Sequence, residues 1–140
     1  MTRIGLLGAA NIAPAAIIRP VSKRGDCQIT SVGCRDQARG AAFAARHGLP
    51  DRVMSYGDIC RAEDIDMIYC ALPPGVHAEW VPLALETGKA VLCEKPFSMG
   101  TTDAKLMAEV SRRSGAPLME AFHYYFHPVF QKIRDIVKSG

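Results

Sequence analysis

Short apolar runs alternate with helix-like segments along almost the whole chain, and this alternation constrains the fold more than any other feature of the sequence. The run over residues 67–72 is continuously apolar and is bounded by Asp66 and Pro73, as expected of a strand buried on both faces. The other apolar runs are similarly short and are separated by segments of helical length. The pattern therefore predicts an α/β fold in which helices cover both faces of a parallel sheet.

Six strands and the helices between them can be located from the residue patterns. We expect strands over residues 3–8, 28–34, 52–55, 67–72, 90–93 and 117–122. We expect helices over residues 11–22, 36–47, 56–61, 77–86, 101–113 and 128–138, with caps at Asp36 and at Thr101 or Thr102. This rhythm predicts one doubly wound Rossmann domain over residues 1–140, with strand order 3-2-1-4-5-6 and right-handed crossovers.

Composition bounds the kind of protein that this chain can be. The chain has 140 residues, of which 49% are hydrophobic, so it can form one domain with a buried core but not two domains. The formal net charge is +3 and the basic residues are scattered, which gives no support for nucleic-acid binding. We find no signal-peptide pattern and no run of about 18 apolar residues, so we expect no membrane association.

The five cysteines indicate a reducing environment. Their number is odd, and no two of them have C-x-x-C spacing. Three of them lie in apolar runs that are predicted to be buried strands. We therefore expect free thiols, a cytoplasmic location and no metal site.

The turn after the first predicted strand carries a relaxed form of the phosphate-binding fingerprint of dinucleotide-binding domains. Its residues match G-x-A-x-x-A, and they are Gly8, Ala9, Ala10, Asn11, Ile12 and Ala13. The glycine permits a sharp turn, the backbone at Ala10 approaches a pyrophosphate, and the helix N-terminus that follows favours an anion. We expect residues 8–12 to bind a dinucleotide; the alternative is an ordinary tight turn between a strand and a helix.

The end of the second predicted strand bears on the choice of nicotinamide cofactor. An NAD site places an acidic residue about 20 residues beyond the fingerprint. This chain has Cys34, Arg35 and Asp36 there. A guanidinium at Arg35 can pair with the 2′-phosphate of NADP, so we expect NADP in preference to NAD, with Asp36 as the feature that favours NAD. The alternative is a solvent-exposed arginine beside an aspartate that only caps the next helix.

The loop after the fourth predicted strand lies at the same edge of the sheet. Leu72 and Pro73 begin a stiff loop that we expect to lie against the cofactor, and His77 is expected to point toward the crevice from the next helix. The alternative for His77 is a structural role in the first helical turn, with Trp80 packing one turn later.

Two opposite charges, Glu94 and Lys95, directly follow the fifth predicted strand and are succeeded by Pro96. At the mouth of a crevice, Lys95 can orient and polarise a carbonyl or hydroxyl group, and Glu94 can hold the lysine or a ribose hydroxyl. Pro96 fixes the chain direction, and the sequence leaves the cis or trans state of its peptide bond open. The alternative is a surface ion pair at a strand end.

Four segments spread over the whole chain carry a joint resemblance, namely GLLGAANIA, VHAEW, GKAVLCEKP and EAFHYYFHP. Together they resemble the amino-terminal nucleotide-binding domain of the glucose-fructose oxidoreductase/inositol dehydrogenase (Gfo/Idh/MocA) family. The resemblance implies an oxidoreductase that transfers hydride between a nicotinamide cofactor and a hydroxyl or carbonyl carbon of a sugar, polyol or similar small molecule. Lys95 stands at the position of the family's catalytic lysine.

The resemblance also implies a partner domain. In the family, an Asp and a His that complete the active site belong to a second, mostly antiparallel α+β domain, which would begin where this chain reaches Gly140. We therefore expect a fragment that binds its cofactor without turning over substrate, and that self-associates as a homo-oligomer through exposed apolar surface. The segment EAFHYYFHP departs from the family's usual pattern at Tyr125, where arginine often stands.

Two other functions could use the same fold. A nucleotide-sensing module would use the crevice for regulation without catalysis, and the substitution Lys95→Ala would separate the two possibilities. A methyltransferase-like domain would bind S-adenosylmethionine, and would normally place an acidic residue rather than Arg35 at the end of the second strand.

Overall fold

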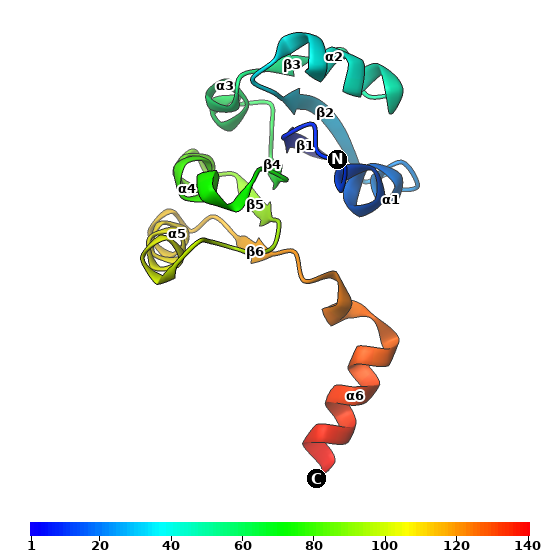
Figure 1. Ribbon diagram of the computed structural model, residues 1–140, viewed down its shortest axis with the longest axis vertical. Helices are drawn as coiled ribbons and strands as arrows, with labels where there is room; N and C mark the ends of the chain where they lie inside the picture. The colour runs from blue at the N-terminus through cyan, green and yellow to red at the C-terminus, as the bar shows by residue number, and fades with distance from the viewer.

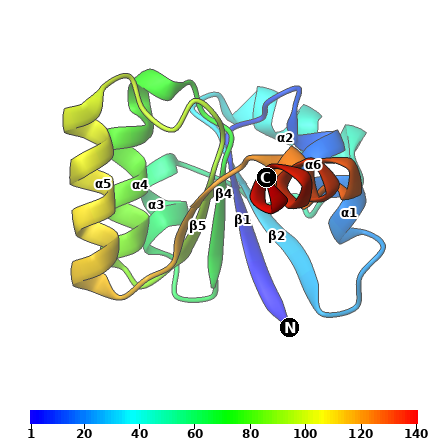
Figure 2. The ribbon, with the colours of Figure 1, turned by 90° about the horizontal axis from the view of Figure 1, so that it is seen from below.

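The computed structural model describes residues 1–140 and contains one six-stranded parallel sheet with helices on both faces (Figures 1 and 2). The strands are β1 Thr2–Leu7, β2 Cys27–Gly33, β3 Val53–Met54, β4 Met67–Cys70, β5 Ala90–Cys93 and β6 Leu118–Glu120. Their order is β3-β2-β1-β4-β5-β6, which confirms the predicted doubly wound Rossmann sheet.

The helical segments follow the strands in the predicted alternation. They are η1 Pro14–Ile18, α1 Arg19–Val21, α2 Gln37–Arg46, α3 Tyr56–Arg61, η2 Pro74–Val76, α4 His77–Glu86, α5 Thr101–Ser114, η3 His123–Phe126 and α6 Pro128–Ser139. Helices α3, α4 and α5 cover one face of the sheet, and α1 and α2 cover the other (Figure 2). None of these helices combines the length and the apolar character that crossing a bilayer requires.

The central strand β4 shows why its sequence is continuously apolar. Ile68 and Cys70 belong to the hydrophobic cluster under α3, α4 and α5, whereas Tyr69 belongs to the cluster on the side of α1 and α2. Successive side chains of a strand point to opposite faces, and here both faces are covered. A parallel strand in the middle of such a sheet therefore has no polar face.

The first helical segment differs from its prediction. A regular helix was expected over residues 11–22, but the chain forms a π-helical turn at η1, where the Arg19 N–H donates to the Pro14 carbonyl, and then the short α1. Pro20 has no N–H to offer to an i−4 carbonyl, and its ring would clash with that carbonyl in a regular helix. The wider turn before Pro20 accommodates both restrictions.

The predicted caps had different outcomes. Asp36 caps α2 as expected, because its Oδ1 accepts a hydrogen bond of 3.0 Å from the Arg39 N–H. The predicted cap at Thr101 or Thr102 is wrong: α5 begins at Thr101 itself, after Gly100, with no side-chain cap. The Gly100 carbonyl already accepts the first helical hydrogen bond, from the Ala104 N–H, so both threonines lie inside the first turn.

Four strands end in register along one edge of the sheet, and this edge positions the site. Leu7 pairs with Gly33 of β2 and with Cys70 of β4, and Cys70 pairs with Cys93 of β5. Ala71 and Leu72, which were expected to extend the fourth strand, instead begin the loop after it. The loops that follow these four residues therefore share one rim.

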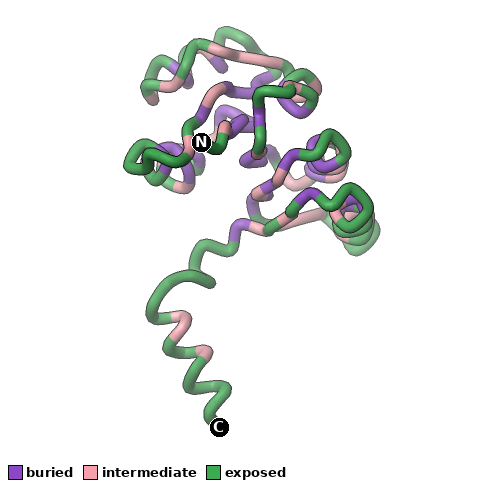
Figure 3. The backbone as a smooth tube through the Cα atoms, turned by 180° about the vertical axis from the view of Figure 1, so that it is seen from behind, coloured by how far each residue is buried: buried purple, intermediate pink, exposed green.

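The C-terminal segment is set apart from the sheet. After β6, residues 122–140 form η3 and α6, which project away from the layered part of the molecule (Figures 1 and 3). No residue of α6 is buried. The hydrophobic core therefore lies within the preceding residues.

Candidate functional site

A cavity of about 400 Å³ opens at the carboxyl ends of β1, β2 and β4. Strand order reverses between β1 and β4, and in doubly wound sheets this is where ligands bind. The lining residues come from the loops after β1, β2 and β4 and from the first turns of α2 and α3, and are Gly8, Ala9, Ala10, Cys34, Arg35, Asp36, Arg39, Tyr56, Ala71, Leu72 and Pro73. Seven of the residues expected at a cofactor site from the sequence are thus brought together.

The turn after β1 requires glycine at position 8. Gly8 has a φ of +101°, a conformation that side-chain-bearing residues rarely adopt. A Cβ atom there would lie 3.1 Å from Leu72 Cδ2 and 3.2 Å from the Ala71 carbonyl oxygen. The loops after β1 and β4 can therefore approach each other closely only if no side chain stands between them.

Three backbone donors in and beside this turn have no partner in the protein. The Ala10 N–H donates to the Gly8 carbonyl at 2.9 Å, but the N–H groups of Ala9, Asn11 and Ile12 form no hydrogen bond within the chain. The side chains of Asn11 and Ile12 are exposed and do not line the cavity. The backbone N–H groups of these two residues, just before η1 begins, are therefore the part of them that can bind a ligand. Free N–H groups at the start of a helix typically bind an anion.

Arginine side chains dominate the charge of the cavity. Arg35 is exposed and lines the cavity, as the sequence predicts. Arg39 also lines it, with its Nη2 donating to the Ala9 carbonyl at 3.3 Å, and was missed by the sequence analysis. The signal was available, because Arg39 stands three residues after the cap Asp36, in a helical turn that faces the same sheet edge.

His77 does not line the cavity. Its ring is fully buried, with Nε2 2.8 Å from the Leu72 carbonyl oxygen and Nδ1 3.0 Å from the Phe97 carbonyl oxygen. It therefore connects the loop after β4 with the loop after β5, which fits the structural alternative for this residue. A direct contact between His77 and the cofactor stays a prediction.

Tyr56 is a second lining residue that the sequence analysis missed. It begins α3, two residues after the end of β3, and its ring packs edge-on against Trp80 at a centroid distance of 5.5 Å. An aromatic residue directly after a strand end at this edge was the available signal.

Glu94 is a buried carboxylate held from three directions. It is 5% exposed, and its Oε1 accepts a hydrogen bond of 2.5 Å from the Tyr69 hydroxyl and lies 3.3 Å from His123 Nε2. Its Oε2 accepts a hydrogen bond of 3.2 Å from the Lys95 backbone N–H. Burial, together with the hydrogen bond to this carboxylate, raises the pKa of Tyr69, so that the phenol remains a donor. Glu94 thus fixes the backbone from which Lys95 extends.

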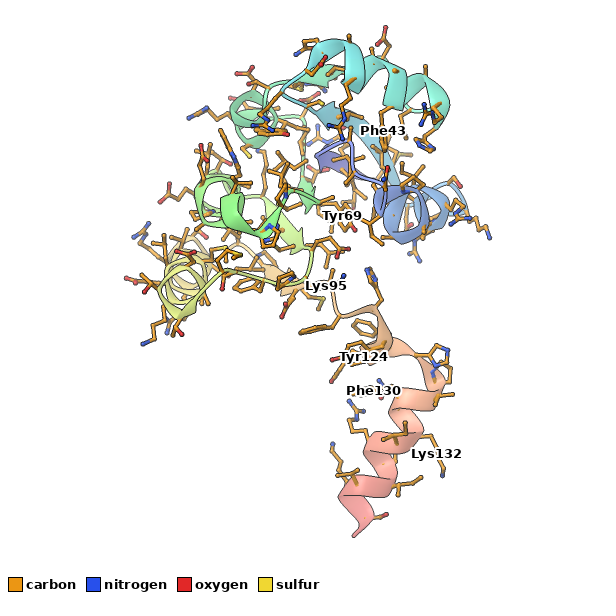
Figure 4. The ribbon with its side chains drawn as sticks, viewed as in Figure 1. Phe43, Tyr69, Lys95, Tyr124, Phe130 and Lys132 are labelled. Carbon is orange, nitrogen blue, oxygen red and sulfur yellow. The ribbon has the colours of Figure 1, made fainter.

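Lys95 is exposed two residues after the end of β5, at the same edge as the cavity but outside its lining (Figure 4). Its ammonium group forms no ion pair with Glu94 or with any other carboxylate of the chain. The peptide bond between Lys95 and Pro96 is cis, which answers the question that the sequence left open. An unpaired ammonium on a fixed backbone is available to a bound molecule.

Comparisons with known proteins agree with this geometry. The family model described as "Oxidoreductase family, NAD-binding Rossmann fold" (GFO_IDH_MocA) matches residues 2–122. The chain is 34% identical over 135 residues to D-xylose 1-dehydrogenase (NADP(+)) 2 of Haloferax volcanii, which covers 96% of this chain and 41% of that protein. It is 35% identical over 138 residues to a dTDP-3,4-didehydro-2,6-dideoxy-alpha-D-glucose 3-reductase of Saccharopolyspora spinosa, covering 99% of this chain and 41% of that protein.

Solved structures extend the similarity to three dimensions. The crystal structure of KijD10, a 3-ketoreductase from Actinomadura kijaniata in complex with NADP, superposes with a TM-score of 0.88 at 32% identity, over 99% of this chain and 44% of that chain. The chain thus spans less than half the length of the relatives that it matches. Because the family model covers most of the sequence, the chain belongs to the Gfo/Idh/MocA oxidoreductase family and comprises its NAD-binding Rossmann fold.

Proposed function

We propose that this chain is the cofactor-binding part of an NADP-dependent oxidoreductase that transfers hydride to or from a hydroxyl or carbonyl carbon of a sugar, polyol or related small molecule. The observation that carries the proposal is the cavity at the switch point. It combines two arginines with a glycine turn, in and beside which three amides have no partner in the chain. A pyrophosphate-bridged dinucleotide supplies the anions that these groups lack.

The preference for NADP rests on how the charges after β2 are used. The Asp36 carboxylate accepts the Arg39 N–H at Oδ1 as the cap of α2, so its orientation is set by the helix, and two arginines line the cavity beside it. Arg35 and Arg39 both line the cavity and can pair with a 2′-phosphate. The names of relatives that bind or use NADP support the same choice.

Lys95 is our candidate for the residue that contacts the substrate oxygen. Its backbone is fixed by Glu94, and its ammonium has no carboxylate partner, so it can hydrogen-bond and polarise a carbonyl or alcohol oxygen. The nicotinamide ring, when bound, accepts or donates the hydride. The sugar-related names of the matched proteins support a polyhydroxylated substrate.

Calorimetric titration with NADPH, NADH and S-adenosylmethionine tests the cofactor. We expect NADPH to bind more tightly than NADH, and S-adenosylmethionine to give no heat. Arg35→Ala should weaken NADPH binding about 10- to 150-fold, since hydrogen bonds to charged groups contribute about 1.5–3 kcal/mol. Arg46→Ala, at the far end of α2, is the matched control. Absence of heat from both nicotinamide nucleotides would contradict the proposal, whereas tighter binding of NADH would contradict only the part that concerns Arg35.

Catalysis is tested in a protein that includes the sequence matching the rest of the relatives. Lys95→Ala should abolish hydride transfer and leave NADPH affinity unchanged, with Lys105→Ala on α5 as the control. Unchanged turnover in Lys95→Ala would exclude the catalytic role. A wild-type protein that binds NADPH but oxidises no polyol or sugar would favour the nucleotide-sensing module.

Five free thiols, four of them buried, support the cytoplasmic location that the sequence predicts.

A further inference from the structure

Two thiols and an imidazole come together beneath the crevice, in a part of the core to which the proposed hydride transfer assigns no chemical role. Cys70 and Cys93 are paired residues at the ends of β4 and β5, and His77 belongs to the first turn of α4. One ligand atom from each lies within 4.8 Å of the others, and Cys93 Sγ lies 3.2 Å from His77 Nδ1. All three residues are 0% exposed.

The Nδ1 side of the His77 ring, where Cys93 Sγ lies 3.2 Å away, has the geometry to accept a cation. Both ring nitrogens face carbonyl oxygens, Leu72 on the Nε2 side and Phe97 on the Nδ1 side. A neutral imidazole carries only one N–H, so in either tautomer one nitrogen lone pair faces the lone pairs of an oxygen. A cation on the Nδ1 side removes this conflict: Nε2–H then donates to Leu72, as metal-bound histidines commonly do to a carbonyl.

We propose that Cys70, His77 and Cys93 bind a zinc ion, with the Phe97 carbonyl oxygen completing the coordination. Zinc lies about 2.3 Å from sulfur and about 2.0 Å from nitrogen, so ligand atoms around one ion are roughly 3.3–3.8 Å apart. The set observed here spans 3.2 Å to 4.8 Å, so closing it requires a movement of about 1 Å. Binding replaces the thiol protons, which pass to solvent, and involves no change of oxidation state.

Charge favours a divalent ion at this position. Two thiolates neutralise Zn(II), whereas they would leave a monovalent soft ion with a net negative charge in a fully buried site. Thiolate and imidazole ligands also disfavour magnesium and calcium, which prefer oxygen. The sequence-based expectation of no metal site followed from spacing along the chain, whereas these ligands are brought together by strand pairing.

Zinc at this position would join the loops on which the proposed site depends. Cys93 and Phe97 flank the three residues Glu94, Lys95 and Pro96, and Cys70 ends the strand that precedes the loop after β4. The ion would therefore fix the backbone around Lys95 from the side of the hydrophobic core. The inference does not depend on the identity of the cofactor or substrate.

Cobalt(II) is the spectroscopic probe for this test, applied to the reduced protein with a phosphine reductant and no added thiol. Because the site is buried, cobalt is added both to the folded protein and during refolding. We expect one cobalt per chain, with a thiolate-to-cobalt charge-transfer band and the visible bands of tetrahedral coordination, and displacement of both by zinc. Cys70→Ser and Cys93→Ser should each lose the charge-transfer intensity.

Cys60→Ser is the matched control, because Cys60 is an equally buried thiol of the same core cluster but lies outside the ligand set. It should bind cobalt as the wild type does. X-ray absorption of the wild-type zinc form, which requires no variant to fold, should count two sulfur ligands. Absence of a cobalt spectrum, retention of that spectrum in both ligand variants, its loss in Cys60→Ser, or a first shell without sulfur would each overturn the proposal.

Discussion

Helices α5 and α6 have similar lengths and both are amphipathic, yet they are used in opposite ways. Helix α5 packs against α4 and buries Met107 and Val110. Helix α6 buries none of its residues (Figure 3). Four of its apolar residues are 51–75% exposed: Val129, Ile133, Ile136 and Val137. The same sequence pattern predicts both helices, but only the layered sheet supplies one of them with an apolar partner.

The largest expected difference lies in stability. Met107→Ala removes a fully buried side chain from α5 and should reduce the free energy of unfolding by about 2–5 kcal/mol. Ile133→Ala removes a half-exposed side chain from α6 and should change it by no more than about 0.5 kcal/mol. Urea unfolding measures both. Comparable losses of stability from the two substitutions would show that α6 is packed in solution, and would contradict the difference between α5 and α6 described above.

The exposed face of α6 should drive self-association, as the sequence analysis expects of this chain. Sedimentation equilibrium should show concentration-dependent association, and Ile133→Lys together with Val137→Lys should weaken it at least about tenfold, which corresponds to about 1.4 kcal/mol. Leu106→Lys is the control, since Leu106 is exposed on α5. A monodisperse monomer at high concentration would contradict this prediction.

The smallest effect concerns ion pairs, none of which involves α6: four lie within the layered domain, and the fifth joins His123 of η3 to Glu94. Hydrogen bonds from Arg3 hold the pKa of Asp66 well below its usual value. The ionised carboxylate therefore stabilises the fold above its unfolded pKa of about 3.9, and this contribution is lost as pH falls through the lower folded value. In Asp66→Asn, the melting temperature should fall less steeply than in the wild type as the pH is lowered below about 4. An equally steep fall in the variant would exclude the Arg3–Asp66 pair as the cause of the loss of stability in acid.

Strand order and most element boundaries could be predicted from the sequence, because a parallel sheet covered on both faces requires short apolar strands that alternate with helices. The π-turn could not, because it depends on a clash between Pro20 and a preceding carbonyl, which is seen only when a helix is built. The uncapped start of α5 was missed because two adjacent threonines imitate a cap.

The candidate site was predictable only where residues directly follow strands. Gly8, Arg35 and Leu72 were identified in this way. Tyr69 lies inside a strand, and its role depends on Glu94, which follows the neighbouring strand β5, a pairing that no local pattern encodes. Arg39 was missed although the cap at Asp36 was predicted, because its partner, the Ala9 carbonyl, lies in a different loop.

Asp36 both lines the cavity and caps α2, and this has a consequence for protein engineering. Its Oδ1 caps α2, so a design that turns this carboxylate toward a ribose in order to obtain NADH specificity has to keep Oδ1 on the Arg39 N–H, and replacing Asp36 would remove the helix's own cap. Cofactor preference and folding are therefore linked at one residue. A redesign that replaces Arg35 and retains Asp36 avoids this trade-off.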